Sequence, residues 1–396
     1  MSFHYRFAPH ITKIPSNPII HLSHRLNEPG FINFAPGAPA AETFPYQDIS
    51  KITEELLSRN LGEIMQYGTT EGYPPARNAM AKLISRAGLK PKPENIVITT
   101  GGQQALNMLF KMFVEPGDVV LVESPTYSAA LQILKSHRAH AIPLDSDGDG
   151  LLPEDLEEKI GIFDPKAVYL NPTFKNPSGG VISLERRKAA AEITGRLGVL
   201  LIEDDPCRDL RYAGDHLPAI KSFDRSGNVV YITSTSKILC PGLRVGAAYV
   251  PDALVPTMIV TKQAADMHSP TLPQAIVSLF AERGLLEPHI GRICGIYGKK
   301  LDLAMSAIGE FFPEEVGAAT PQGGLFIWCV CPENVNVAEV FERAIRQKVA
   351  FLPGDQFFPD GGGQNAFRLN FTNAKSEDIA KGVEILGRLL RDCVRA

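Results

Sequence analysis

The stretch Ile96-Val97-Ile98-Thr99-Thr100-Gly101-Gly102 decides the fold, because a β-branched strand ends there in two glycines. The residues that follow, 103–114, form an apolar stretch that predicts a helix. A strand that passes through a glycine turn into a helix is the repeating unit of α/β sheets. We therefore expect further copies of this unit along the chain.

Several such copies follow the first. The apolar runs that we interpret as their strands lie at 119–122, 167–170, 199–202, 229–232 and 247–250. Several of these runs are continuous rather than alternating, as in strands that helices cover on both faces. The pattern predicts an α/β fold with a mainly parallel sheet sandwiched by helices.

The pattern of predicted helices and strands changes towards both ends of the chain. The first 45 residues are rich in proline and read as an arm and a loop. Helical segments run from 251 to 308 with a break near Gly284, and strand patterns at 323–328 and 366–371 indicate a smaller α+β domain. The domains that we expect are an arm over 1–45 packing with the small domain, a large domain over 46–290 and a small domain over 291–396.

The composition excludes several classes of protein. The 396 residues carry 40 Lys and Arg against 44 Asp and Glu, and this balance is not that of a nucleic-acid-binding protein. No apolar run approaches the roughly 20 residues of a membrane span, and the start lacks a signal-peptide pattern. Six cysteines are too few for a disulfide scaffold, and we expect Cys329 and Cys331 to be buried thiols. A cytoplasmic enzyme is the expectation.

Two segments resemble metal sites but lack the ligands that a metal would need. Residues 145–150 read DSDGDG like the start of an EF-hand loop, yet Leu156 stands where the bidentate Glu should be. His21 and His24 have the spacing H-x-x-H without a third ligand nearby. The glycine fingerprints of dinucleotide and nucleoside-triphosphate sites are missing. We expect no metal.

The segment Ser234-Thr235-Ser236-Lys237 directly follows an apolar strand. A lysine that attacks a carbonyl must be neutral, and its pKa falls where a strand end is partly desolvated. The two serine hydroxyls and the forked donors of Arg244 could bind a phosphate. Taken alone, this segment is more often a polar turn.

Other strand ends carry complementary groups. Asp204 ends a strand in a place where a carboxylate is costly unless it meets a cation, such as a protonated pyridine nitrogen. Asn176 offers an amide, Tyr127 an aromatic face, and Gly102 opens a helix whose N–H groups suit an anion. All follow the carboxyl ends of strands, where open α/β sheets bind ligands. With Lys237 for an imine, these groups describe a site for pyridoxal 5′-phosphate.

On these motifs the sequence resembles the fold-type I pyridoxal-phosphate enzymes of the class I/II aminotransferase group. It is most similar there to the α-aminoadipate (LysN-type), kynurenine and multi-substrate aminotransferases. The likeness runs from Phe34-Ala35-Pro36-Gly37 to Phe367-Arg368-Leu369. It implies a large domain with a seven-stranded, mainly parallel sheet, a small α+β domain and a homodimer. It also implies a ping-pong transfer of an amino group between an L-amino acid and a 2-oxo acid.

The resemblance assigns a role to each candidate residue. Lys237 would form the internal aldimine and shuttle the proton between Cα and C4′. Asp204 would keep the ring nitrogen protonated, and Arg368 would clamp the substrate α-carboxylate. The implied cofactor contacts are Gly102, Gln103, Tyr127, Asn176, Cys207, Ser234, Ser236 and Arg244, with Tyr67 supplied by the neighbouring subunit. The implied substrate contacts besides Arg368 are Asn176, Gly37, Ile20 and the segment 351–354.

The largest departure from the family pattern is Cys207, which stands where the group usually has a tyrosine that bonds the ring oxygen. A thiol is a weak donor, so we expect the pKa of the imine to rise and transamination to slow, or another outcome to be favoured. A tolerated substitution with Asn176 compensating is an open alternative, as is a reactive thiol.

Smaller departures concern the phosphate end and the substrate side of the site. Gly102 replaces a common Ser, Lys175 a Gln and Thr235 a Phe. Ile20 falls where aminoadipate enzymes carry an Arg, which predicts that an acidic side chain is not the preferred substrate.

Two other functions are consistent with parts of the pattern. Cys207 and Lys175 would also suit a pyridoxal-phosphate enzyme that eliminates from, cyclises or oxidises a basic or modified amino acid. Regulators of the MocR type share the fold but carry a winged-helix segment first. Since this chain begins at the aminotransferase arm, we do not expect a regulator.

Overall fold

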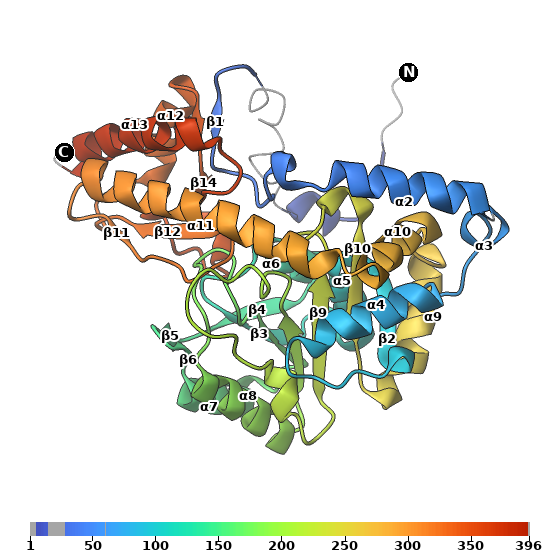
Figure 1. The fold of residues 1–396 in the computed structure, drawn as a ribbon. Helices are drawn as coiled ribbons and strands as arrows, with labels where there is room; N and C mark the ends of the chain where they lie inside the picture. Colours follow the sequence, from blue (N-terminus) through green and yellow to red (C-terminus); the bar gives the residue numbers. More distant parts are fainter. Residues whose placement is uncertain (1–4, 15–27, 60, 395–396) are drawn as a thin grey trace.

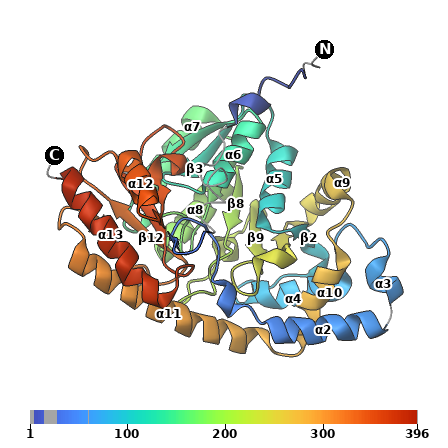
Figure 2. The same cartoon turned by 90° about the horizontal axis from the view of Figure 1, so that it is seen from above.

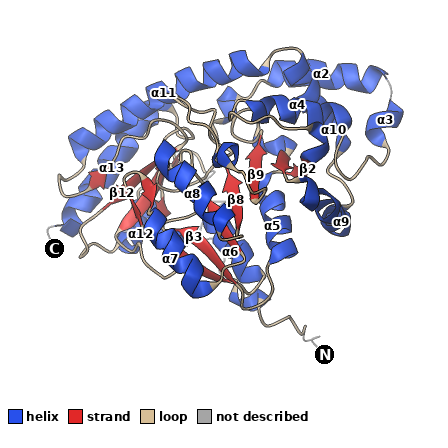
Figure 3. Ribbon diagram, turned by 90° about the horizontal axis from the view of Figure 1, so that it is seen from below, coloured by secondary structure: helices blue, strands red, loops and turns tan. Residues whose placement is uncertain are grey.

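The computed structural model describes residues 5–14, 28–59 and 61–394. Its centre is a seven-stranded sheet in the order β2-β10-β9-β8-β7-β3-β4 (Figures 1 and 3). The strands are β2 (Ile96–Thr100), β3 (Val119–Glu123), β4 (His140–Leu144), β7 (Ala167–Leu170), β8 (Leu200–Asp204), β9 (Val229–Ser234) and β10 (Val245–Tyr249). The predicted fold class is confirmed.

Strand β10 alone in this sheet runs opposite to its neighbours, β2 and β9, while the other pairs are parallel. Its direction was not predicted, nor was β4. Residues 235–244 connect β9 to β10, and this connection is too short for the crossover helix that a parallel pair needs. The chain therefore turns straight back, and the turn carries Lys237.

Helices cover both faces of the sheet (Figures 2 and 3). Helices α5, α6 and α9 pack on one face through residues such as Val97 and Ile202. Helices α7 and α8 cover part of the other face through residues such as Leu121, and α4 and α10 cover the rest through residues such as Ile98. The bounds are α4 (Pro74–Ser85), α5 (Gly102–Phe113), α6 (Ser128–Ser136), α7 (Pro153–Phe163), α8 (Leu184–Arg196), α9 (Val255–Asp266) and α10 (Thr271–Glu282).

A smaller antiparallel sheet in the order β11-β12-β15-β14 packs with the C-terminal helices. Its strands and helices are β11 (Gly317–Ala318), β12 (Phe326–Val330), β14 (Leu352–Pro353), β15 (Ala366–Asn370), α12 (Val337–Arg346) and α13 (Ser376–Val394). Helix α11 (Leu286–Phe311) begins beside α10 and ends beside α13 (Figures 1 and 2). The expected boundary at 290/291 lies inside α11, and Gly284 forms the turn before it with φ +67°.

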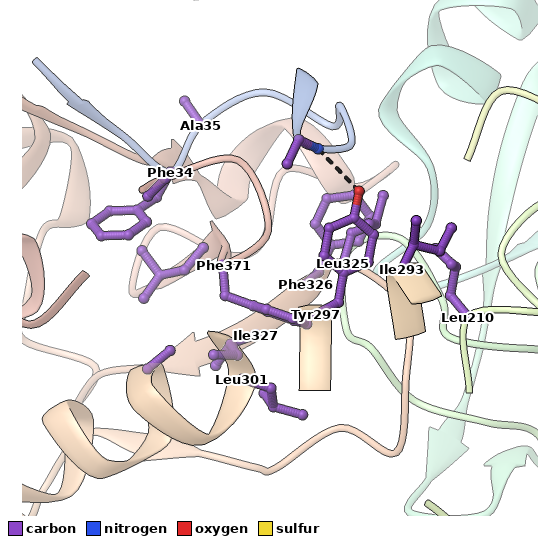
Figure 4. Packing of buried hydrophobic residues seen from close by; sticks show 14 of the residues in the cluster. Phe34, Ala35, Leu210, Ile293, Tyr297, Leu301, Leu325, Phe326, Ile327 and Phe371 are labelled. Atoms are coloured by element: carbon purple, nitrogen blue, oxygen red, sulfur yellow. Dashed lines mark hydrogen bonds between the residues drawn. The ribbon is translucent and has the colours of Figure 1, made fainter. Parts of the chain in front are cut away.

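The arm ends against the small domain. Strand β1 (Ile32–Asn33) pairs in parallel with β13 (Val349–Ala350). Phe34 then packs in a core with Ile327 and Phe371 (Figure 4). The Tyr297 hydroxyl on α11 accepts a hydrogen bond from the Ala40 N–H at 3.1 Å. The segment after β1 is therefore held at both of its ends.

The remaining elements are short or peripheral: η1 (Ile11–Lys13), η2 (Ala41–Thr43), α2 (Tyr46–Arg59), α3 (Leu61–Met65), η3 (Pro93–Asn95), β5 (Ser146–Asp147), β6 (Gly150–Leu151), η4 (Ile220–Phe223), η5 (Pro241–Leu243), η6 (Asp252–Leu254) and η7 (Gly354–Phe357). The segment that resembles a calcium loop forms the hairpin β5–β6.

Three structural findings bear on the expectations from composition. Within the described residues, no three His, Cys, Asp or Glu side chains gather as metal ligands, and His21 and His24 lie outside those residues. Among the described helices, none combines the length and apolar character that crossing a membrane requires. All six cysteines are free thiols, with Cys329 and Cys331 buried.

Candidate active site

A cavity of about 450 Å³ opens where the strands of the large sheet end and the small domain meets them. This volume is within the range of small-molecule sites. Most of the residues singled out from the sequence line it together: Gly37, Gly102, Gln103, Tyr127, Asn176, Asp204, Cys207, Ser234, Ser236, Lys237, Arg244 and Arg368. Leu352, from the predicted segment 351–354, also lines it.

One end of the cavity is suited to an anion. Helix α5 begins at Gly102, so its first N–H groups lack partners within the helix. A Cβ atom on Gly101 would lie 2.3 Å from Arg244 Nη2, so only glycine lets the guanidinium lie against this helix start. The Ser234 hydroxyl donates to that of Ser236 at 2.9 Å. Backbone amides, hydroxyls and one guanidinium together fit a phosphate.

Asp204 ends β8 at the wall of the cavity. Its Oδ2 accepts a hydrogen bond from the Tyr169 hydroxyl at 2.9 Å, and its main-chain oxygen accepts one from Asn171 Nδ2 at 2.5 Å. Burial raises the pKa of the carboxyl from 3.8 to about 7, against the lowering effect of Tyr169. A carboxylate in this place is stabilised by a cationic partner, and a protonated ring nitrogen is one.

Sequence reasoning missed Tyr169 and Asn171, although both line the cavity. Tyr169 lies inside the apolar run of β7, where a buried aromatic residue is the ordinary interpretation. Asn171 lies directly after the same strand, and its position at a strand end was the available signal.

Lys237 lies in the turn after β9 and is largely surrounded by protein. Burial lowers the pKa of its amine, and the nearby guanidinium groups of Arg368 and Arg244 lower it further, while Cys207 and Asp204 act in the opposite direction. The Nζ atom donates a hydrogen bond to the Gly37 carbonyl at 2.5 Å. A neutral amine is the form that can attack a carbonyl carbon.

Arg368 lies on β15 and is 3% exposed. Its Nη1 donates to Asn176 Oδ1 at 2.6 Å and its Nη2 to the Ala35 carbonyl at 2.7 Å, while the guanidinium lies 4.1 Å from the Phe326 ring centre. Burial lowers its pKa to about 9. Within the described part of the chain its Nε has no hydrogen-bond partner and no carboxylate pairs with it. The guanidinium can therefore receive a carboxylate from outside.

Cys207 is buried in the wall of the cavity, and Tyr127 is partly buried there. Burial raises the pKa of the Cys207 thiol to about 12, so the thiol is protonated at neutral pH. A protonated thiol is a poor nucleophile, which does not favour the reactive-thiol interpretation. Burial likewise raises the pKa of Tyr127 to about 12, so its ring is uncharged.

Lys175 does not line the cavity but supports the loop that carries Asn176. Its ammonium lies 2.5 Å from Glu123 Oε1, and Glu123 Oε2 accepts from the Asn171 N–H at 3.0 Å. Asn171 Oδ1 in turn accepts from the Asn176 N–H at 2.8 Å. The buried carboxylate of Glu123 thus pairs with the positive charge that Lys175 brings in place of the Gln common in the family.

One described candidate, Tyr67, does not line this cavity. Tyr67 is 77% exposed, and its ring meets that of His268 edge-on at 5.9 Å. Ile20 lies outside the described residues.

Comparisons with known proteins identify the family. Residues 29–386 match the family model described as aminotransferase class I and II, so the chain belongs to this family of pyridoxal-phosphate-dependent enzymes. It is similar to aromatic-amino-acid aminotransferase 1 of Thermococcus litoralis, with 35% identity over 91% of this chain and 88% of the relative.

Two solved structures are similar over nearly the whole chain. The multiple substrate aminotransferase of Thermococcus profundus has a TM-score of 0.92 and 35% identity, with 98% of each chain covered. LysN of Thermus thermophilus, an α-aminoadipate aminotransferase, has a TM-score of 0.91 and 33% identity, again with 98% of each chain covered. That LysN structure contains N-(5′-phosphopyridoxyl)-L-leucine.

The chain is therefore an aminotransferase that uses pyridoxal 5′-phosphate and takes amino-acid and 2-oxo-acid substrates. The alternative of elimination, cyclisation or oxidation is not favoured, because the enzymes named among its relatives transfer amino groups. The described residues of the cavity fit the cofactor: an anion cup, a buried carboxylate with no salt-bridge partner among them and a largely enclosed lysine line the same space.

Asp204 predicts how the stability of the cofactor-free enzyme depends on pH. Since the folded-state pKa of about 7 exceeds the ordinary 3.8, the folded chain keeps a proton that the unfolded chain releases. The Asp204 contribution to the unfolding free energy is thus most favourable below about pH 4 and is lost as pH rises towards 7. This contribution to the free energy of unfolding changes by at most about 1.4 kcal/mol per pH unit.

We expect Asp204→Asn to lack this dependence. The stability of the variant relative to the wild type should increase between pH 5 and 8, measured by denaturant unfolding of both cofactor-free proteins. Adding pyridoxal phosphate should stabilise the wild type more than the variant. A stability difference that stays constant with pH would contradict the assignment.

Proposed function

We propose that this aminotransferase prefers amino acids with uncharged aromatic or aliphatic side chains. The observation that carries the proposal is the count of cations among the described residues of the cavity wall, namely Lys237, Arg244 and Arg368. Each has a task at the cofactor or at the α-carboxylate, so none is left for a distal carboxylate. Apolar groups supply much of the remaining wall, among them Pro36, Phe326 and Leu352.

The residue roles that we propose follow from the contacts in the cavity. Bound pyridoxal phosphate supplies an electrophilic carbon for the amino group and a ring that takes up an electron pair. Arg368 receives the α-carboxylate through donors that include its Nε. The neutral amine of Lys237 removes the proton from the substrate Cα. Asp204 holds a proton at the ring nitrogen.

Asn176 has one orientation that suits both of its proposed partners. Its Oδ1 is occupied by Arg368 Nη1, so the Nδ2 donors are left for the ring oxygen of the cofactor. The Cys207 thiol nearby stays protonated and can donate a hydrogen bond. A thiol is only a weak donor, however. Asn176 is therefore the main proposed donor to that oxygen.

We further propose that the enzyme is a cytoplasmic homodimer in amino-acid biosynthesis and that Tyr67 completes the phosphate site of the partner. Tyr67 follows α3, which lies beside α9 and α10 at one end of the molecule (Figures 1 and 2). Large apolar side chains are exposed at this end, at Met65, Val260 and Met267. Such exposed residues are typical of an interface. The free thiols suit a reducing compartment.

A substrate panel tests the proposed preference. With a common 2-oxo acid, kcat/KM for phenylalanine or leucine should exceed that for 2-aminoadipate by at least about tenfold, since an unpaired buried carboxylate costs more than 1.4 kcal/mol. Product identification by mass spectrometry checks that the matching 2-oxo acid forms. A higher kcat/KM for glutamate or 2-aminoadipate would refute the preference.

Mixed dimers test the shared site. Tyr67→Ala and Lys237→Ala should each be nearly inactive as homodimers. Mixing them with subunit exchange should restore up to about a quarter of wild-type activity, because half of the dimers are mixed and each contains one complete site. The control mixture contains Asp145→Ala and Lys237→Ala. Asp145 is exposed and lies away from the cavity, so this mixture shows the effect of subunit exchange alone. If the first mixture gains nothing although exchange occurs, Tyr67 acts within its own subunit.

Cys207 predicts an unusual pH titration of the bound cofactor. A phenol donor at the ring oxygen withdraws negative charge that otherwise helps to hold a proton on the Lys237 nitrogen. Cys207→Tyr should therefore lower the midpoint of the absorbance titration by about one pH unit. Cys207→Ala is the matched control and should change it little, since a thiol donates weakly. An unchanged midpoint in Cys207→Tyr would show that Asn176 already compensates.

A further inference from the structure

The segment that follows β1 contacts two of the proposed active-site residues at once. We call residues 35–38 the strap. The carbonyl of Ala35 accepts a hydrogen bond from Arg368 Nη2 at 2.7 Å, and that of Gly37 accepts one from Lys237 Nζ at 2.5 Å. The strap thus bonds the group proposed for the substrate carboxylate and the proposed proton carrier. Their relative placement depends on where these two carbonyls lie.

The other two carbonyls of the strap are bound by a single side chain. Asn370 Nδ2 donates to the Pro36 carbonyl at 2.5 Å and to the Ala38 carbonyl at 2.8 Å. Because Pro36 and Ala38 flank Gly37, this amide fixes the backbone on both sides of the carbonyl that meets Lys237. Asn370 is fully buried and is not among the residues that line the cavity.

The orientation of the Asn370 amide is fixed as well. Its Oδ1 accepts from the N–H and the hydroxyl of Thr372 at 2.9 and 2.8 Å, and its own N–H donates to the Phe34 carbonyl at 2.7 Å. Only an oxygen can accept from the Thr372 N–H, so the nitrogen must face the strap. A flipped amide would therefore lose these bonds.

The sequence of β15 explains why Asn370 and Arg368 act on the same segment. Alternate residues of a strand point to the same face, so Arg368 and Asn370 share one face while Phe367 and Leu369 enter the core on the other. Two polar residues at i and i+2 on a fully buried strand are costly unless both are bonded. The strap carbonyls provide those bonds.

We propose that Asn370 is a positioning residue for transamination. Its amide fixes the strap, so that the Ala35 and Gly37 carbonyls hold the Arg368 guanidinium and the Lys237 amine at a fixed position relative to each other. It acts through the strap and touches neither substrate nor cofactor. The proposal rests on the proposed roles of Arg368 and Lys237. Loss of the amide should disturb carboxylate binding and the Lys237 amine together, although neither residue is changed.

Asn370→Ala tests the proposal without adding a charge near Lys237. Asp204, Cys207, Arg244 and Arg368, which face the Lys237 amine, stay unchanged. We expect KM for the best amino-acid donor to rise about tenfold, as for loss of one buried hydrogen bond, with a smaller change in kcat.

The second readout uses the cofactor-free enzyme. The rate at which it captures pyridoxal phosphate, followed by absorbance, depends on the neutral fraction of Lys237. Losing the Gly37 acceptor removes stabilisation of the charged amine, so the midpoint of the rate–pH profile should fall by about half a pH unit. A purely structural residue would leave this midpoint unchanged.

Asn373→Ala is the matched control. Asn373 Nδ2 donates to the Asn33 carbonyl at 3.0 Å, just before the strap, so its loss removes an equivalent bond without touching residues 35–38. It should lower the melting temperature while KM and the capture midpoint stay near wild type. If Asn370→Ala does not fold, Asn370→Ser, which keeps one donor, should show the same two changes at smaller size.

The outcomes separate this inference from the proposed function. Lower thermal stability of Asn370→Ala with wild-type KM and capture midpoint would overturn the positioning role. Arg368→Gln tests the role on which it rests: if its KM is unchanged, the proposed carboxylate site is wrong. If KM rises in Arg368→Gln but not in Asn370→Ala, only the inference about Asn370 fails.

Discussion

The burial of ionisable groups in one cavity is the constraint on which the rest of this structure depends. Asp204 and Arg368 are buried and Lys237 is largely surrounded by protein, and burial shifts the pKa of each towards the neutral form. Such a site is costly for the cofactor-free protein. In the proposed arrangement, the protonated ring nitrogen of the cofactor pairs with Asp204, and the substrate carboxylate pairs with Arg368.

The fold brings these charges together from distant parts of the chain. The large sheet contributes the ends of β8 and β9, α5 contributes its first N–H groups, and the small sheet contributes Arg368. The strap then spans the two domains, since it bonds Lys237 on one side and Arg368 and Asn370 on the other. The strap therefore links the Lys237 side chain to the small domain through hydrogen bonds.

Much of the site could be predicted because its residues follow strands with strong local patterns. Asp204, Asn176 and Lys237 each lie just after an apolar run, and parallel strands bring such ends to one edge. Tyr169 and Asn370 escaped notice because they lie inside buried strands, where position in sequence does not reveal what the side chain meets. Glu123, the partner of Lys175, was hidden for the same reason.

The sequence by itself determined most strands of the large sheet, the alternation of strand and helix, and the chemical types of the groups at strand ends, because periodicity and residue chemistry are local properties. Only the tertiary structure decided that β10 turns back, that Arg368 holds Asn176 and that Asn370 holds the strap. These depend on contacts between residues far apart in the chain, such as the 334 positions that separate Pro36 from Asn370. Packing alone fixes such contacts, since no local pattern specifies which buried donor meets which carbonyl.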